Sequence, residues 1–127
     1  MGRGPQPTKV LLVEDDVLIS AIVADELRDY GFVVHEASTG EQAIRLLESD
    51  PDIAILFTDI NLPGDLEGRE VAVRARAMRP DLPIVYASGR YAAFGLDGMV
   101  PRSLFVPKPY RPAEVCALLA RLTEPSH

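Results

Sequence analysis

The sequence contains no tryptophan and a single cysteine, Cys116, among its 127 residues. One cysteine cannot form a disulfide within the chain, and this suits a reducing compartment. No apolar run approaches the roughly 20 residues that a membrane-spanning helix needs. Basic residues are also few, because 13 lysines and arginines stand against 19 acidic residues, for a formal net charge of −6. This balance argues against a general nucleic-acid-binding protein, which usually carries a basic patch.

The composition that remains is typical of one globular domain. Hydrophobic residues make up 47% of the chain and charged residues 25%, and a chain of this length can bury a core of its own. We expect a flexible leader at 1–8, one domain at 9–123 and a tail at 124–127. The expected location is the cytoplasm, with no membrane and no direct nucleic-acid partner.

Short apolar or β-rich segments alternate with helical patterns along the whole chain. Strands are expected at 9–13, 32–37, 53–59, 83–87 and 104–106. Helices are expected at 17–30, 42–49, 71–78 and 112–122, and less clearly at 90–99, where Gly95 and Gly98 disfavour a long helix. With right-handed crossovers, this alternation predicts an α/β fold, a doubly wound and mostly parallel sheet with helices on both faces.

Helix ends and faces can be read from the same segments. Asp16 is a suitable N-cap and Gly31 a suitable stop for the first helix, while Ser38 and Glu41 match a capping box before the second. Helical spacing predicts an inner face of the first helix made of Ile19, Ile22, Val23, Leu27 and Tyr30. The arginines of the third helical region are expected on a solvated face: Arg69, Arg74, Arg76 and Arg79.

Carboxylates follow two of the expected strands. Glu14 and Asp15 come directly after the first strand, and Asp59 ends the third. Because open α/β sheets bind ligands at the carboxyl ends of their strands, we expect these three side chains to converge there. Carboxylates that meet raise one another's pKa unless a cation intervenes, and hard oxygen ligands suit Mg²⁺. A carboxylate beside Mg²⁺ can act as a nucleophile toward phosphorus, and this makes Asp59 a candidate for phosphoryl transfer.

Two further polar residues follow the fourth and fifth strands. Lys108 can supply a positive charge, and Ser88 a hydroxyl donor to a phosphoryl oxygen. Each residue also has a plainer interpretation, since Glu14 with Asp15 equally suits helix capping, Asp59 and Ser88 suit turns, and Lys108 suits an exposed surface. Their coincidence at the carboxyl ends of successive strands favours a functional site.

Four segments, in this order and spacing, resemble the receiver domain of bacterial response regulators in two-component signalling. They are Val-Leu-Leu-Val-Glu-Asp-Asp at 10–16, Thr-Asp-Ile-Asn-Leu-Pro-Gly at 58–64, Ala-Ser-Gly at 87–89 and Phe-Val-Pro-Lys-Pro at 105–109. The resemblance covers the chain from Lys9 to about Leu122. It implies a flavodoxin-like (βα)5 fold with strand order 2-1-3-4-5, here expected as a stand-alone, single-domain receiver.

The resemblance also implies a reaction and its metal. Asp59 would be the phosphoacceptor, which takes a phosphoryl group from a phosphohistidine on a sensor kinase or a histidine phosphotransfer protein. Asp15 would bind Mg²⁺ directly and Glu14 mainly through water, with Asp59 and the backbone carbonyl of Asn61 as further ligands. Beyond phosphotransfer and autodephosphorylation at Asp59, we expect no conventional enzyme activity.

Other residues would respond to the phosphorylated state, again by resemblance. Ser88 and Lys108 would contact the phosphoryl group, and Ser88 with Phe105 would form the switch that changes a protein-binding surface. Asn61 and Arg90 occupy positions that tune the lifetime of the phosphoryl group. The downstream partner is not specified, and a homodimer is an arrangement that the resemblance allows.

Two features depart from the common receiver pattern. The loop at 63–68 is one residue longer than usual, and the segment at 86–91 resembles a motif of some stand-alone receivers in stress signalling, with Tyr86 and Ser88 in place of phenylalanine and threonine. Two alternative functions stay open. One is a receiver-fold binding module that works without phosphorylation, and the other is a small aspartyl-phosphate phosphatase, which usually has a second acid where Asn61 stands.

Overall fold

A computed structural model describes residues 7–89 and 100–123 of the chain. Within them, five parallel strands form one sheet in the order β2-β1-β3-β4-β5. The strands are β1 (Lys9–Val13), β2 (Val33–Ala37), β3 (Ile53–Asp59), β4 (Ile84–Ser88) and β5 (Ser103–Pro107). This arrangement confirms the predicted strand order and the doubly wound sheet. The expected helical segment at 90–99, with Arg90, and the tail at 124–127 lie outside the described residues.

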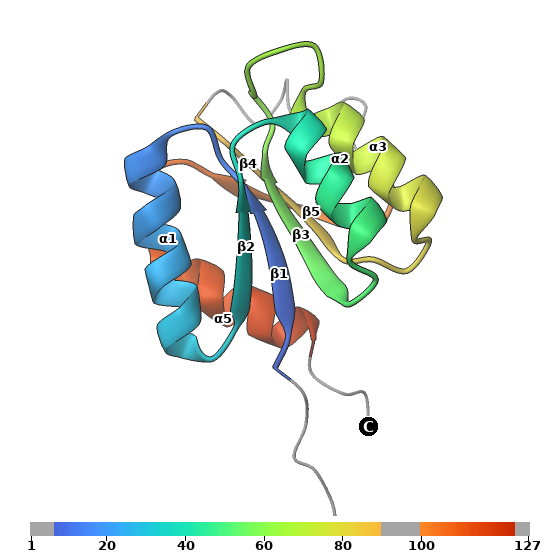
Figure 1. Ribbon diagram of the computed structural model, residues 1–127. Helices are drawn as coiled ribbons and strands as arrows, with labels where there is room; N and C mark the ends of the chain where they lie inside the picture. Colours follow the sequence, from blue (N-terminus) through green and yellow to red (C-terminus); the bar gives the residue numbers. More distant parts are fainter. Residues whose placement is uncertain (1–6, 90–99, 124–127) are drawn as a thin grey trace, which may run out of the picture.

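Helices cover both faces of the sheet (Figure 1). On one face lie α1 (Val17–Tyr30) and α5 (Pro112–Leu122), and on the other lie α2 (Gly40–Ser49) and α3 (Gly68–Met78). Among the residues that the structure describes, no helix is long and apolar enough to cross a membrane. The helices turn their apolar faces toward the sheet and bury it between two layers.

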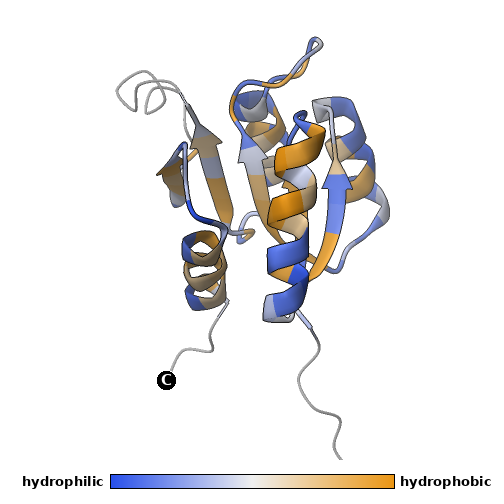
Figure 2. Cartoon of the chain, turned by 90° about the vertical axis from the view of Figure 1, so that its left-hand side faces the viewer, coloured by the Kyte–Doolittle hydropathy of each residue, from blue (hydrophilic) through white to orange (hydrophobic). Residues whose placement is uncertain are grey.

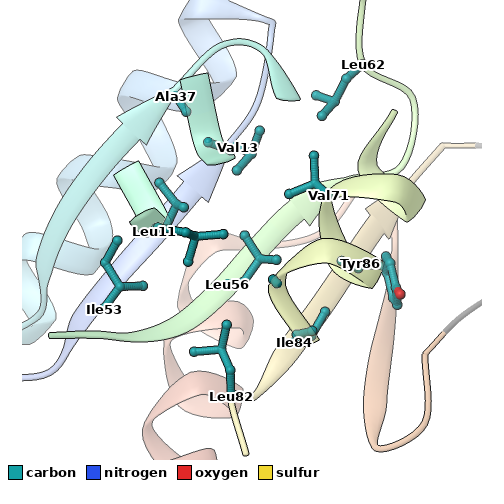
Figure 3. Close-up of a cluster of buried hydrophobic side chains, with 14 of the residues drawn as sticks. Leu11, Val13, Ala37, Ile53, Leu56, Leu62, Val71, Leu82, Ile84 and Tyr86 are labelled. Carbon is teal, nitrogen blue, oxygen red and sulfur yellow. The ribbon is translucent and has the colours of Figure 1, made fainter. Parts of the chain in front are cut away.

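Strand β3 lies at the centre of the sheet and contributes to two separate cores. Leu56 packs on the side of α2 and α3, which Figure 3 shows, whereas Ile55 and Phe57 pack on the side of α1 and α5. All three side chains have exposed fractions of 1% or less. This burial on both faces explains why β3 is a continuous apolar run rather than an alternating one.

The caps of α1 are those expected, whereas α2 is capped by Thr39 rather than by Ser38. Asp16 Oδ1 accepts hydrogen bonds from the amides of Leu18 and Ile19, at 3.0 and 3.2 Å. At the start of α2, Thr39 rather than Ser38 is the N-cap, and its hydroxyl accepts from the amide of Gln42 at 3.1 Å. The prediction that paired Ser38 with Glu41 was wrong because the helix begins one residue later, at Gly40.

The predicted inner face of α1 was wrong for two residues. Ile22 and Tyr30 have exposed fractions of 60% and 54%. The buried face instead includes Ser20, whose hydroxyl donates to Glu36 Oε1 at 2.8 Å. A polar residue can lie on that face because its hydroxyl has a partner, and helical spacing alone cannot reveal such a pairing. Ile22, which is left outside, lines a groove described below.

Two arginines, Arg76 of α3 and Arg79 at its C-cap, hold the backbone rather than facing solvent. Arg79 donates to the carbonyl oxygens of Ile53 at 2.6 Å and Leu47 at 2.8 Å, and so joins the end of α2 to the start of β3. Arg76 donates to the carbonyl oxygen of Leu82 at 2.7 Å, just before β4. The expectation of a solvated arginine face was therefore wrong for both, because their guanidinium groups satisfy carbonyls that the ends of helices and strands leave unpaired.

Candidate functional site

The pairing of β1 with β3 brings three acids together at the carboxyl edge of the sheet. Val13, the last residue of β1, lies opposite Thr58 of β3. Glu14 and Asp15 follow directly on one strand, and Asp59 on the other. Carboxylate oxygens of these three residues all lie within 4.8 Å of one another. The convergence expected from the sequence is therefore present.

The three acids differ in burial. Glu14 and Asp59 have exposed fractions of 4% and 8%, whereas Asp15 is exposed. Burial raises the pKa of Glu14, while hydrogen bonds from Lys108 and from the amide of Asp16 oppose this shift. A buried carboxylate with a raised pKa is incompletely compensated, so a further cation at this point would be favourable.

Lys108 spans the two buried acids. It follows β5 directly, and its Nζ lies 2.9 Å from Asp59 Oδ2 and 2.7 Å from Glu14 Oε1. Burial alone would lower the pKa of Lys108, but the hydrogen bonds to Glu14 and Asp59 outweigh burial and raise it. The lysine is therefore charged throughout the physiological pH range, and it fixes the Asp59 carboxylate from the side of β5.

Ser88 and Asn61 form the next part of the same edge. Ser88 ends β4 and has an exposed fraction of 3%. The side-chain amide of Asn61 donates to Ser88 Oγ at 3.4 Å, and the backbone amide of Asn61 donates to Asp59 Oδ1 at 3.1 Å. The polar residues expected from the sequence thus lie around one carboxylate, that of Asp59.

Phe105 lies apart from this polar group. It is in the middle of β5, opposite Tyr86 of β4, and packs against the core on the side of α2 and α3. Tyr86 itself is fully buried (Figure 3). Ser88 is two residues beyond Tyr86 in β4, so both side chains point to the same face of the sheet. Tyr86 therefore lies between Phe105 and the site. Arg90, the remaining predicted site residue, lies outside the described residues.

Gly68 is a site residue that sequence reasoning missed. A Cβ atom on Gly68 would lie 1.9 Å from the carbonyl oxygen of Asp59 and 2.8 Å from the Cα of Ile60. The amide of Gly68 also donates to the carbonyl of Ile60 at 2.9 Å. The first residue of α3 therefore rests directly on the backbone of Asp59. The only sequence signal was a glycine at the end of the loop, which is also an ordinary loop residue.

The long loop between β3 and α3 is anchored by apolar residues. Leu62 and Leu66 are buried in the core between α2 and α3, although their neighbours in the loop are exposed. A Cβ atom on Gly40 would lie 2.3 Å from the carbonyl oxygen of Leu66, so the loop packs directly on the start of α2. The exposed part of the loop lies above the edge of the sheet (Figure 1).

Tyr110 lies beside the site, and its raised pKa predicts how the stability of the protein depends on pH. Burial raises its pKa to about 12, and its ring centroid lies 5.7 Å from that of Phe57. Between the ordinary value of 10.0 and this raised value, the unfolded chain loses the proton and the folded protein keeps it. Stability therefore falls as the pH rises through this window. Ultraviolet titration should show a late tyrosine ionisation that Tyr110→Phe removes, and its persistence in that variant would contradict the assignment.

The fold and the site together define a class of protein: a doubly wound α/β domain with a cluster of three acids and a lysine at the carboxyl edge of its sheet. The model of the response regulator receiver domain family matches residues 10–120, and the chain belongs to this family. The expected resemblance is confirmed over nearly the whole described chain.

Named relatives agree with this assignment. The chain is 28% identical over 123 residues to the two-component response regulator ORR11 of Oryza sativa subsp. indica, with 94% of this chain and 83% of that protein covered. It is 30% identical over 132 residues to the response regulator SaeR of Staphylococcus epidermidis, with 94% and 54% covered. A crystal structure of a response regulator receiver protein from Sinorhizobium medicae is similar with a TM-score of 0.87 and 32% identity, covering 92% of this chain and 94% of that one.

Proposed function

We propose that this protein is a cytoplasmic phosphoacceptor of a two-component phosphorelay, with Asp59 as the residue that is phosphorylated. The observation that carries the proposal is the environment of the Asp59 carboxylate. It is nearly buried, it is hydrogen-bonded by Lys108, and it lies beside the carboxylates of Glu14 and Asp15. Phosphoryl transfer needs positioning and charge neutralisation more than covalent machinery, and this environment offers both.

The donor set fits Mg²⁺. Three carboxylates that lie within 4.8 Å of one another supply hard oxygen ligands, and the buried Glu14 needs additional positive charge. We propose that Asp15 and Asp59 bind the metal directly, Glu14 through water, and Asn61 through its backbone carbonyl. Bound Mg²⁺ would neutralise charge on the phosphoryl oxygens.

In the reaction, an oxygen of the Asp59 carboxylate attacks phosphorus while the bond from phosphorus to the donor's imidazole nitrogen breaks. The electron pair of that bond stays on the nitrogen, and the product is an aspartyl phosphate. Lys108, which holds Asp59 Oδ2 at 2.9 Å, would move its hydrogen bond to a phosphoryl oxygen. Water later attacks the same phosphorus, the bond from phosphorus to the Asp59 oxygen breaks, and inorganic phosphate leaves. The carboxylate is thereby restored, so the protein itself ends the signal.

Phosphorylation would then change the surface around β4 and β5. Ser88, whose hydroxyl accepts from Asn61 before the reaction, would turn to donate to the phosphoryl group. The space that it leaves lies on the face of the sheet where Phe105 packs, so Phe105 would change rotamer. Asn61 and Arg90 would set how long the phosphoryl group lasts. A downstream protein or a second copy of the chain would bind the altered surface.

The phosphodonor would approach across α1. Val17, Leu18 and Ile22 have exposed fractions of 76%, 75% and 60%, and Figure 2 shows the apolar amino-terminal turns of this helix. A groove of about 440 Å³ lies between α1 and the start of α5, and Lys108 is part of its lining. Lys108, which lines this groove, also contacts Asp59. An apolar helix of a kinase or phosphotransfer protein can therefore bind in the groove while its phosphohistidine reaches Asp59.

Metal removal tests this proposal. Incubation with acetyl phosphate and Mg²⁺ should label Asp59, and a chelator should lower the labelling rate by about 100-fold or more, because the metal supplies several kcal/mol of charge stabilisation. The control is the chelator with excess Mg²⁺, which should restore the rate. A labelling rate that the chelator does not change would contradict the metal site. A lack of millimolar Mg²⁺ affinity would favour a binding module that works without phosphorylation.

A further inference from the structure

Thr58 is a fully buried polar residue in the strand that carries Asp59. Its exposed fraction is 0%, and it lies between Val13 of β1 and Tyr86 of β4 in the sheet. Its hydroxyl donates to the carbonyl oxygen of Asp59 at 2.9 Å, within the protein interior. We propose that Thr58 is a positioning residue that holds the peptide group after Asp59 in the orientation that phosphorylation requires. This inference rests on the proposed function of Asp59.

A hydroxyl at this position calls for a reason. The neighbouring residues of β3, from Ile53 to Phe57, are apolar, and valine would have the same shape and an equal preference for a strand. Burying a hydroxyl is favourable only when it makes a hydrogen bond. The acceptor of that hydrogen bond therefore indicates the role of the hydroxyl. Here the partner is the backbone of the proposed phosphoacceptor rather than a distant element of the core.

The peptide group between Asp59 and Ile60 is held through both of its polar atoms. Asp59 is the last residue of β3, and beyond it the amide of Ile60 still donates to the carbonyl of Ala87 at 2.9 Å. The next amide, that of Asn61, turns back and donates to Asp59 Oδ1 at 3.1 Å. A rotation of the peptide group between Asp59 and Ile60 would therefore move the Asn61 amide away from the carboxylate. The Thr58 hydroxyl resists this rotation from the side of the strand.

Gly68 restrains the same carbonyl from another direction. A Cβ atom there would lie 1.9 Å from the Asp59 oxygen, so α3 leaves room for this oxygen only because Gly68 lacks a side chain. Thr58 holds the oxygen by a hydrogen bond, and Gly68 confines it by close packing. Neither residue contacts the reacting carboxylate oxygens, so both act through the position of the backbone.

Two variants of Thr58 separate positioning from simple packing. Thr58→Val keeps the shape and removes the hydroxyl, whereas Thr58→Ser keeps the hydroxyl and removes a methyl group from the core. We expect Thr58→Val to lower the rate of Asp59 labelling by acetyl phosphate, at saturating Mg²⁺, by about fivefold, the effect of one hydrogen bond. Thr58→Ser should keep the rate within about twofold, although the methyl group that it removes from the core lowers its melting temperature below that of the wild type.

A purely structural role would lower the rate of both variants, because each loses an interaction in the core, whereas the positioning role lowers the rate only where the hydroxyl is absent. A rate for Thr58→Val equal to that of the wild type, or a rate for Thr58→Ser as low as that of Thr58→Val, would overturn the inference. Nuclear magnetic resonance adds a readout that does not need phosphorylation, because the Asn61 amide resonance should shift in Thr58→Val and stay near its wild-type position in Thr58→Ser. A wild-type protein that is not labelled contradicts the proposed function, whereas an unshifted Asn61 resonance in Thr58→Val contradicts the positioning role.

Discussion

Asp59→Asn should lower phosphorylation by acetyl phosphate and Mg²⁺ at least about 100-fold, because a neutral amide is a poor nucleophile toward phosphorus. The substitution keeps the size of the side chain, and Lys108 retains its 2.7 Å contact with Glu14. One negative charge also leaves a cluster of three carboxylates, so the folded protein should be at least as stable as the wild type. Labelling with radioactive phosphodonor and thermal melting measure the two effects.

Asp16→Asn is the matched control for this experiment. Asp16 is next to the acidic pocket in sequence, but it is exposed, and its carboxylate caps α1. Asparagine caps a helix about as well as aspartate, so this variant should be labelled at the wild-type rate. If Asp59→Asn were labelled as fast as the wild type, the phosphoryl group would have to be on another residue, and the assignment of Asp59 would be wrong.

Gly68→Ala should destabilise the protein by about 2–4 kcal/mol and lower its melting temperature by roughly 10 °C. The new Cβ would lie 1.9 Å from the carbonyl oxygen of Asp59 and 2.8 Å from the Cα of Ile60. Both are backbone atoms, so no change of rotamer can relieve the overlap. Either α3 or the backbone of Asp59 must move, and the phosphorylation rate should fall about tenfold or more because misplaced reacting groups react slowly.

Gly89→Ala is the matched control for Gly68→Ala. Gly89 also lies at the carboxyl edge of the sheet, but among the described residues a Cβ there would meet only the Cβ of Lys108, at the ordinary contact distance of 3.8 Å. We expect its melting temperature to stay within about 3 °C of the wild type, since no close overlap arises. Equal melting temperatures for the two variants would show that α3 moves away from Asp59 easily, contrary to the packing described above.

Most of the fold could be predicted from residue patterns because its signals are local. The apolar run of β3 reflects burial on both faces, and Asp16 and Gly31 mark the ends of α1 by their own hydrogen bonds and backbone angles. The errors occurred where a tertiary partner decides the outcome. Ile22 has the helical spacing expected of a residue on the buried face of α1, but it is 60% exposed. Arg79 is a charged residue of the kind usually found on a surface, but it donates to backbone carbonyls.

The kind of fold and the identity of the acids follow from the order of residue patterns along the chain, because alternating strands and helices place the ends of parallel strands at one edge. Glu14, Asp15 and Asp59 could be singled out for this reason alone. How Asp59 is held depends instead on tertiary contacts: Lys108 reaches it from the end of β5, and Gly68 and Thr58 confine its carbonyl oxygen. These contacts depend on distances of a few ångströms, either between segments far apart in the chain or between a side chain and the backbone of the next residue. A pattern of residue types does not contain such distances.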